Sequence, residues 1–183
     1  MNNIDFKTSA LLIIDVQKDY WNFPQPIRDD FIETIQDLVG RFKKRNVTII
    51  YVKHISRRPG RYFQKNTPGS ELIDDLHPDE NDFIIEKNTP GCFYETDLDK
   101  ILKEKGIKTL FIAGLQTHHC CDTTCREASA RNYTTYIVKD AVDTFDITGI
   151  DGKNIERSVL NYITLSILGD GFCKIISLED IPK

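Results

Sequence analysis

Short apolar runs alternate with segments of helical periodicity along this 183-residue chain, and the alternation restricts the fold more than any other feature. Strands buried on both faces of a parallel sheet are continuous apolar runs, whereas amphipathic helices place apolar residues three and four positions apart. The apolar runs occupy residues 10–15, 47–52, 83–85, 109–113, 135–138 and 174–176, and the helical pattern occupies 31–42, 98–102, the segment after 120, and 155–168. The sequence therefore predicts one α/β domain over residues 1–183, built on a parallel sheet.

The charge balance and the cysteine count limit the classes of partner. A formal net charge of −4 without a basic face argues against nucleic acid, and no apolar run is long enough to predict a membrane span. The first residues lack the pattern of a signal peptide, and five cysteines, three of them within 120–125, do not suggest a disulfide framework. We therefore expect a cytoplasmic protein whose partner is a small molecule.

Three chemically distinctive residues stand at the ends of apolar runs. Asp15 and Lys87 each end one run, and the turn 114–120 that follows another run carries Cys120. In open α/β sheets the ligand crevice lies at the carboxyl ends of the strands, and charges buried there need partners. Any one of these residues alone is more often a loop cap or a side chain that reaches solvent. Together they predict a converging site, in which the start of a helix lowers the pKa of the Cys120 thiol and makes it a nucleophile.

Three separated motifs contain these residues. They are Leu12-Ile13-Ile14-Asp15-Val16-Gln17, then Glu86-Lys87 with Phe93 and Thr96-Asp97-Leu98, then Gly114-x-x-Thr117-x-x-Cys120-x-x-x-Thr124-x-Arg126-x-Ala128. In this combination, over roughly residues 9–145, the chain resembles the isochorismatase-like cysteine hydrolases. That family includes nicotinamidases, carbamoylsarcosine and ureidoacrylate amidohydrolases, biuret hydrolases and isochorismatases.

The resemblance implies a three-layer α/β/α fold whose six-stranded parallel sheet has the strand order 3-2-1-4-5-6. It also implies an Asp-Lys-Cys triad in which Cys120 is the nucleophile, Asp15 the acid/base and Lys87 the charge partner. Strand three then lies two places from strand one, about 10 Å away, and the long stem of Lys87 must span that gap. Backbone N–H groups of Gln116 and Cys120 would form the oxyanion hole, with a cis peptide bond before Gln116.

The chemistry that follows is hydrolysis of a C–N bond in a small amide or ureido substrate through a Cys120 thioester, without a cofactor. Two alternatives remain open. One is vinyl-ether hydrolysis of the isochorismatase type, which needs an acid more than a thiol. The other is a non-catalytic binding or scaffold domain with an incidental thiol, in which the pKa of that thiol need not be strongly depressed.

Several further residues are candidates for the walls of a substrate pocket. Gln17 belongs to the first motif, and Tyr20, Trp21 and Phe93 are aromatic residues that could line the site or simply belong to the core. His54, at a strand end, could line the pocket or bond to loop backbone.

A long connection, residues 54–82, separates the second and third predicted strands. It is either a surface excursion with a short helix at 70–75, or a lid or oligomer contact. Its arginines Arg57, Arg58 and Arg61 could recognise a carboxylate, although a solvated loop is the simpler interpretation. We also expect a homo-oligomer.

The metal site of the nicotinamidase branch has no counterpart in this sequence. That branch carries an Asp-x-His and further histidines after strand two, whereas residues 51–58 offer His54 alone. The cluster of His and Cys at 118–125 is also a poor ligand set, because consecutive helical side chains diverge by about 100°. We therefore expect no metal, weak turnover of nicotinamide, and packing roles for Cys92, Cys121 and Cys125.

Overall fold

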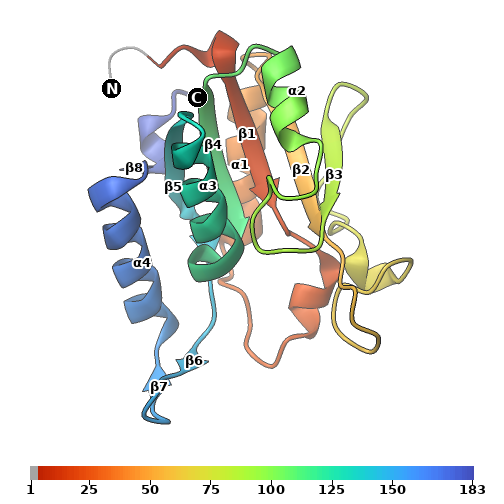
Figure 1. The fold of residues 1–183 in the computed structure, drawn as a ribbon, viewed down its shortest axis with the longest axis vertical. Coiled ribbons are helices and arrows are strands. Elements are labelled where there is room, and N and C mark those ends of the chain that lie inside the picture. Colours follow the sequence, from red (N-terminus) through yellow and green to blue (C-terminus); the bar gives the residue numbers. More distant parts are fainter. Residues whose placement is uncertain (1–3) are drawn as a thin grey trace.

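The computed structural model describes residues 4–183 and is organised around a six-stranded parallel sheet (Figure 1). The strand order is β3-β2-β1-β4-β5-β8, which is the predicted order with β8 as the sixth strand. The strands are β1 (Ser9–Ile14), β2 (Thr48–His54), β3 (Phe83–Lys87), β4 (Thr109–Leu115), β5 (Thr134–Asp143) and β8 (Lys174–Ile176). Five of them begin or end within a few residues of the apolar runs that predicted them, while β5 continues five residues further.

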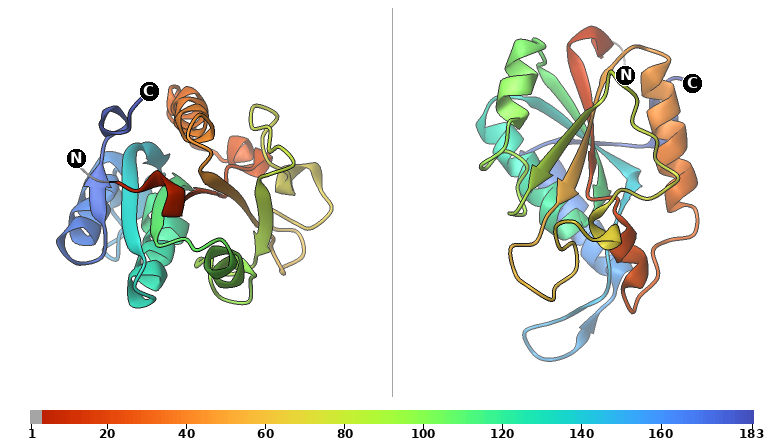
Figure 2. Two further views of the ribbon diagram at one scale, coloured as in Figure 1. Left: turned by 90° about the horizontal axis from the view of Figure 1, so that it is seen from above. Right: turned by 90° about the vertical axis from the view of Figure 1, so that its right-hand side faces the viewer.

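Helices cover both faces of the sheet and complete three layers (Figure 2). One face is covered by α1 (Phe31–Lys43), and the other by α2 (Leu98–Glu104), α3 (Asp122–Ala130) and α4 (Arg157–Gly171). Phe31, Ile35, Leu38 and Phe42 of α1 are spaced by three and four positions and therefore lie on one face of the helix. All four are buried against the sheet. Gly106, with φ +66°, follows the end of α2, where a left-handed residue terminates the helix without steric cost.

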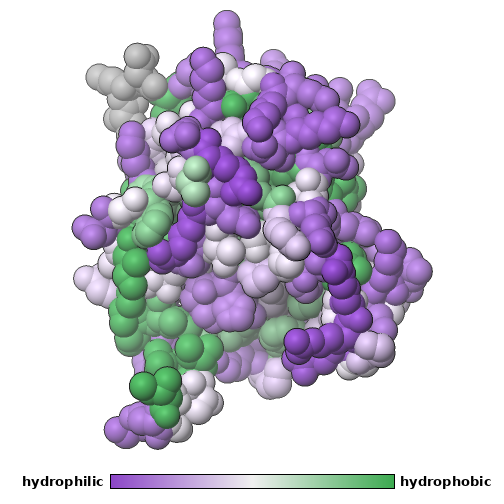
Figure 3. Space-filling model, in the orientation of Figure 1, coloured by the Kyte–Doolittle hydropathy of each residue, from purple (hydrophilic) through white to green (hydrophobic). Residues whose placement is uncertain are grey.

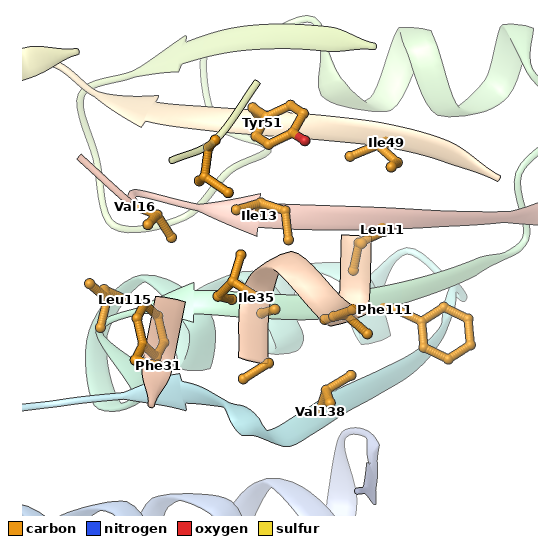
Figure 4. Packing of buried hydrophobic residues seen from close by; sticks show 14 of the residues in the cluster. Leu11, Ile13, Val16, Phe31, Ile35, Ile49, Tyr51, Phe111, Leu115 and Val138 are labelled. Carbon is orange, nitrogen blue, oxygen red and sulfur yellow. The ribbon is translucent and has the colours of Figure 1, made fainter. Parts of the chain in front are cut away.

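The strands divide the core into two layers by simple alternation. In β1, Leu11 and Ile13 point toward α1, while Ala10, Leu12 and Ile14 point to the opposite layer. Figure 4 shows the first layer, where side chains from β1, β2, β4 and β5 meet α1. Burial on both faces explains why β1 is an uninterrupted apolar run.

Two local elements differ from the sequence-based expectation. The chain between β5 and α4 forms a short hairpin, β6 (Ile147–Thr148) with β7 (Asn154–Ile155). Strands of two residues are too short to show a periodic pattern, so the sequence does not predict this hairpin. Within residues 54–82 the predicted helix at 70–75 is wrong. A single 3₁₀ turn, Pro68–Ser70, stands at its start, and the chain then runs beside residues 16–18, where the Lys18 N–H donates to the Glu71 carbonyl and the Ile73 N–H donates to the Val16 carbonyl.

The outer face of α4 is apolar and exposed. Val159, Ile163 and Ile167 each leave about half of their surface in solvent, and Tyr162 leaves more. Figure 3 shows this face as part of the green area at the lower left, over α4 and the β6–β7 hairpin. No helix among residues 4–183 combines the length and apolarity needed to cross a membrane. The expectation of a homo-oligomer stays a prediction.

Candidate active site

The carboxyl ends of β1, β3 and β4 meet at one edge of the sheet, at the lower edge in Figure 1. Asp15 follows β1 directly and is fully buried. Its φ of +54° is in the left-handed region, which a non-glycine residue adopts only where its surroundings enforce it. Its N–H donates to the carbonyl of Val52 at 2.9 Å, so the neighbouring strand β2 holds the Asp15 backbone in place.

The turn after β4 brings Cys120 to the same edge. Gly114 pairs with Ile14, and a Cβ at Gly114 would lie 2.0 Å from the Ile14 carbonyl oxygen. Only glycine permits this approach of β4 to β1. The peptide bond between Leu115 and Gln116 is cis, as predicted, and residues Thr117–Cys121 form one π-helical turn before α3. Such turns often occur at functional sites.

Lys87 joins the other two side chains across β2. From the end of β3 its Nζ donates to Asp15 Oδ2 at 2.7 Å and to Cys120 Sγ at 3.2 Å. A third bond of 3.2 Å goes to the Thr89 carbonyl, so the loop after β3 supplies the third acceptor for the ammonium. The Lys87 side chain is fully buried, which means that its charge depends on these contacts.

The electrostatics of this cluster favour a neutral thiol beside an ion pair. Burial alone would lower the pKa of Lys87, but the adjacent Asp15 carboxylate favours the charged form, and the net effect raises that pKa, so the ammonium is retained. Burial and the Asp15 charge raise the pKa of Cys120 well above its ordinary value, while Lys87 opposes them only in part. This corrects the expectation of a depressed thiol pKa. The helix start lowers a thiol pKa, but the burial of the sulfur and the charge of the adjacent carboxylate raise it and dominate here.

One polar atom near the thiol has no partner within residues 4–183. Asp15 Oδ1 is buried without a hydrogen bond, which leaves a carboxylate oxygen free to accept a proton. Gln116, whose N–H is one of the two expected oxyanion donors, directly precedes the π-helical turn that carries Cys120. The geometry thus places a potential base, at the end of β1, beside the turn that holds the sulfur.

The structure brings some of the predicted pocket residues to the site and not others. Tyr20 is buried near it: burial and then the charges of Asp15 and Cys120 raise the pKa of the Tyr20 hydroxyl. Gln17 is also buried, but its amide donates to the carbonyls of His54 and Ser70 and accepts from the His54 N–H. Gln17 therefore ties the long connection to the sheet, and its polar atoms are engaged by backbone.

Two other predicted wall residues differ in their surroundings. Trp21 is 46% exposed and lines a shallow depression with Lys18 and Ile73. Adjacent residues of a 3₁₀ helix (Lys18–Asn22) diverge by about 120°, so burying Tyr20 turns Trp21 outward. Phe93 stacks on Tyr133, with ring centroids 5.9 Å apart, in the layer between the sheet and helices α2 and α3.

His54 lines a cavity of about 520 Å³ beside the cluster. Its Nδ1 lies 3.5 Å from Lys87 Nζ, and burial and the Lys87 charge lower the pKa of the imidazole. This environment does not fit a metal ligand of the nicotinamidase type, because an ammonium stands beside the only histidine of residues 51–58. Among residues 4–183, no three His, Cys, Asp or Glu side chains gather closely enough to hold a metal ion.

The remaining cysteines of the motif region lie in the apolar layer. Cys121 and Cys125 are fully buried among aliphatic side chains of β4, α3 and α4. Cys92 is equally buried and accepts a hydrogen bond from Thr124 Oγ1 at 3.1 Å, and burial raises its pKa to about 12. These environments are those of packed thiols.

Sequence reasoning missed several residues that shape the site. Thr89 supplies the carbonyl that binds Lys87, and Phe23, Tyr62 and Phe63 form an aromatic wall of the cavity. The position of Thr89 just after a strand end was a usable signal. The sequence gives no comparable signal for the aromatic wall, because Tyr62 and Phe63 belong to the long connection, which has no periodic pattern.

Fold and site together define an α/β protein of the cysteine-hydrolase type, with an acid, an ammonium and a thiol at the carboxyl edge of a parallel sheet. The isochorismatase domain model matches residues 9–163, and the chain belongs to the isochorismatase family. It is 29% identical over 180 residues to the isochorismatase family protein YddQ of Bacillus subtilis, covering 96% of this chain and 99% of that protein.

Two further comparisons extend the likeness. Nicotinamidase 3 of Arabidopsis thaliana is 28% identical over 193 residues, covering 97% of this chain and 88% of that protein. The crystal structure of an isochorismatase from Pseudomonas putida superposes with a TM-score of 0.91 at 28% identity, covering 100% of this chain and 94% of that one. The family relation supports hydrolase activity and leaves the substrate open.

Proposed function

We propose that this protein hydrolyses a C–N bond of a small amide or ureido compound through a covalent thioester on Cys120. The observation that supports this most is the placement of one buried ammonium between a carboxylate and a thiol, at 2.7 and 3.2 Å. A buried charge cluster is costly to maintain, and a thiol used only for packing would not need one. The similarity to a nicotinamidase agrees with amide chemistry.

The cluster contains a group that can carry each proton that the reaction moves. The Sγ–H proton of Cys120 passes to the free oxygen of Asp15 as the sulfur attacks the substrate carbonyl carbon. The raised thiol pKa means that the thiolate forms together with the attack and does not exist beforehand. Lys87 stays positive throughout and stabilises whichever anion is present. Backbone N–H groups of Gln116 and Cys120 bind the oxyanion of the tetrahedral adduct.

Collapse of this adduct breaks the C–N bond, and Asp15 returns its proton to the departing nitrogen. The acyl group remains on Cys120 as a thioester. Water then loses a proton to Asp15 and attacks the thioester carbonyl, the C–S bond breaks, and the thiolate recovers the proton. One water is consumed, and an amine or ammonia and an acid are released.

Isochorismatase-type hydrolysis is the second candidate, favoured by the family to which the chain belongs. Asp15 would then protonate the vinyl ether, and Cys120 would have no covalent role. The two reactions therefore differ in their dependence on the sulfur.

A substrate screen with mass analysis separates these possibilities. Ammonia release is measured from small amides and ureido compounds, and pyruvate release from isochorismate, with wild-type protein and Cys120→Ala. Acid quenching during turnover should reveal an acyl mass on the peptide containing Cys120. Pyruvate release that is retained in Cys120→Ala, with no acyl adduct from any amide, would establish the vinyl-ether reaction instead.

A further inference from the structure

Two cysteine side chains outside the cluster of acid, ammonium and thiol contact each other. Cys125 lies on α3, and Cys173 lies between the end of α4 and the start of β8. The helices α3 and α4 are side by side in Figure 1, and the thiols of Cys125 and Cys173 are hydrogen-bonded to each other. Both thiols are free. The fold therefore pairs two thiols from segments that are distant in the sequence.

The two thiols differ in their access to solvent. Cys125 is fully buried, whereas Cys173 is partly buried at the edge of the same apolar layer. The Cys173 N–H donates to the Leu168 carbonyl at 3.0 Å, so the end of α4 fixes the backbone that carries this sulfur. An oxidant that arrives from water therefore meets Cys173 first, and Cys125 reacts only through Cys173.

The surroundings of Cys173 favour its thiolate. The Cys125 S–H donates to the Cys173 sulfur, and this hydrogen bond lowers the pKa of Cys173 although burial opposes it. The Arg126 guanidinium lowers that pKa further and lies over the Phe172 ring, 4.2 Å from its centroid, while the Asp122 carboxylate acts in the opposite direction. Each of the other four cysteines has a raised thiol pKa, because burial or a neighbouring group favours the neutral form. The thiolate is the form that peroxides oxidise, so Cys173 is the most readily oxidised cysteine of the chain.

We propose that Cys125 and Cys173 form a reversible oxidation site, at which a hydroperoxide converts the two thiols into a disulfide between α3 and the chain entering β8. A disulfide holds its sulfurs about 2 Å apart, and hydrogen-bonded thiols need only a small movement to reach that separation. Cys120 takes no part, because its sulfur accepts from Lys87 and its thiol is buried and neutral. The disulfide would therefore form whether or not Cys120 carries out the proposed hydrolysis.

The oxidation proceeds in two steps. The Cys173 thiolate attacks one oxygen of the hydroperoxide, the O–O bond breaks, and the sulfur becomes a sulfenic acid. The Cys125 sulfur then attacks the Cys173 sulfur, the S–O bond breaks, and the departing hydroxide takes the Cys125 proton and leaves as water. The two thiols lose two electrons and two protons, and hydrogen peroxide is reduced to two waters. An external dithiol reverses the oxidation by thiol–disulfide exchange.

The test adds one equivalent of hydrogen peroxide to the reduced protein at neutral pH. The remaining thiols are then blocked with N-ethylmaleimide in denaturant, and the peptides are analysed by mass without reductant. We expect the peptides of Cys125 and Cys173 to be linked with the loss of two hydrogens, and dithiothreitol should separate them. The linked pair should exceed oxidised Cys120 by at least about tenfold, because a neutral buried thiol reacts slowly.

Single variants distinguish the roles of the two thiols. In Cys125→Ser, the Cys173 sulfur should stop at the sulfenic acid, which dimedone traps. In Cys173→Ser, oxidation of Cys125 should fall at least about tenfold, because the buried thiol loses its route to the oxidant. Cys92→Ser is the matched control, since Cys92 is a fully buried cysteine bonded to Thr124, and the disulfide should form in it as in wild type. Circular dichroism checks that each variant is folded.

Thermal unfolding of the wild-type protein provides a readout that needs no variant. The disulfide closes a loop of roughly fifty residues and restricts the unfolded chain, so the oxidised protein should unfold about 5–10 °C above the reduced one. An unchanged or lower midpoint would overturn the proposal, because the folded pair could then not close without strain. Recovery of Cys173 as a sulfinic acid without a linked peptide, a link between other cysteines, or a link that forms only in the unfolded protein would also overturn it.

Discussion

Cys120 and Cys125 are five residues apart, both are buried, and both have a raised thiol pKa, yet their surroundings differ completely. Cys120 lies 3.2 Å from an ammonium beside a carboxylate with a free oxygen. Cys125 lies in the apolar layer between α3, α4 and the sheet. Burial alone therefore does not distinguish a reactive thiol from a packed one. The difference lies in which charged groups are brought to the sulfur, and four measurements test it.

The largest contrast should be in activity. Cys120→Ala should reduce C–N hydrolysis by at least about a thousandfold, because the bond-forming atom is lost. Cys125→Ala should change kcat/KM by less than about threefold. Steady-state ammonia release measures both, with circular dichroism to show that each variant is folded. Comparable losses in the two variants would remove the functional distinction between the thiols.

The next effect concerns Lys87, whose ammonium contacts Cys120 but not Cys125. Lys87→Met should lower the free energy of unfolding by about 3–5 kcal/mol, because Asp15 is left as an unpaired buried charge. Lys65→Met, which breaks only an exposed pair with Glu86, should cost less than about 1 kcal/mol. Urea denaturation provides the comparison. A Lys87→Met protein as stable as wild type would mean that the cluster is not a tightly coupled pair.

A smaller effect is expected from the packed thiol. Cys125→Ala leaves a small void in a fully buried layer and should lower the free energy of unfolding by about 1–2 kcal/mol. Thr123→Ala is the control, because Thr123 is a half-buried residue of the same helix and should cost less. Equal stability of Cys125→Ala and wild type would indicate that this layer is loosely packed.

The smallest expected effect is a shift in the pH at which the alkylation rate of Cys120 rises. Alkylation needs the thiolate, so a raised pKa makes the rate at Cys120 climb with pH beyond the range of an ordinary thiol. Asp15→Asn removes a negative charge and should shift the profile to lower pH, whereas Lys87→Gln should shift it to higher pH. Iodoacetamide labelling, followed by peptide mass analysis from about pH 7 to about pH 10, measures this. A rate already at its plateau near pH 7 would show a preformed thiolate.

Most of the fold could be predicted because its strands are buried on both faces and therefore form clear apolar runs. The placement of Asp15 and Cys120 at strand ends was also predictable from those runs. The strand-end position of Lys87 was predictable in the same way, whereas the strand order that puts β3 beside β2 needed the family resemblance, since nothing in one sequence gives it. The outward turn of Trp21 could not be foreseen, because it depends on a 3₁₀ geometry that leaves no periodic signal.

The electrostatic state of the thiol was predicted in the wrong direction for a related reason. The sequence predicts that a helix begins near Cys120, and the positive end of the helix dipole lowers a thiol pKa. It does not show how completely the sulfur is removed from water or how near a carboxylate will be. In the structure these two effects dominate.

The position of Lys87 on β3 has a consequence for local stability. β3 is a five-residue strand at the edge of the sheet, paired only with β2, and Ile84 and Glu86 on it are exposed. Edge elements open with a smaller free energy than the centre of a sheet, and native-state hydrogen exchange reports such openings individually. When β3 detaches, the ammonium leaves while β1 and β4 stay folded. Activity should therefore disappear at a lower urea concentration than the central strands unfold, and the most rapidly exchanging amides of the sheet should be those of β3.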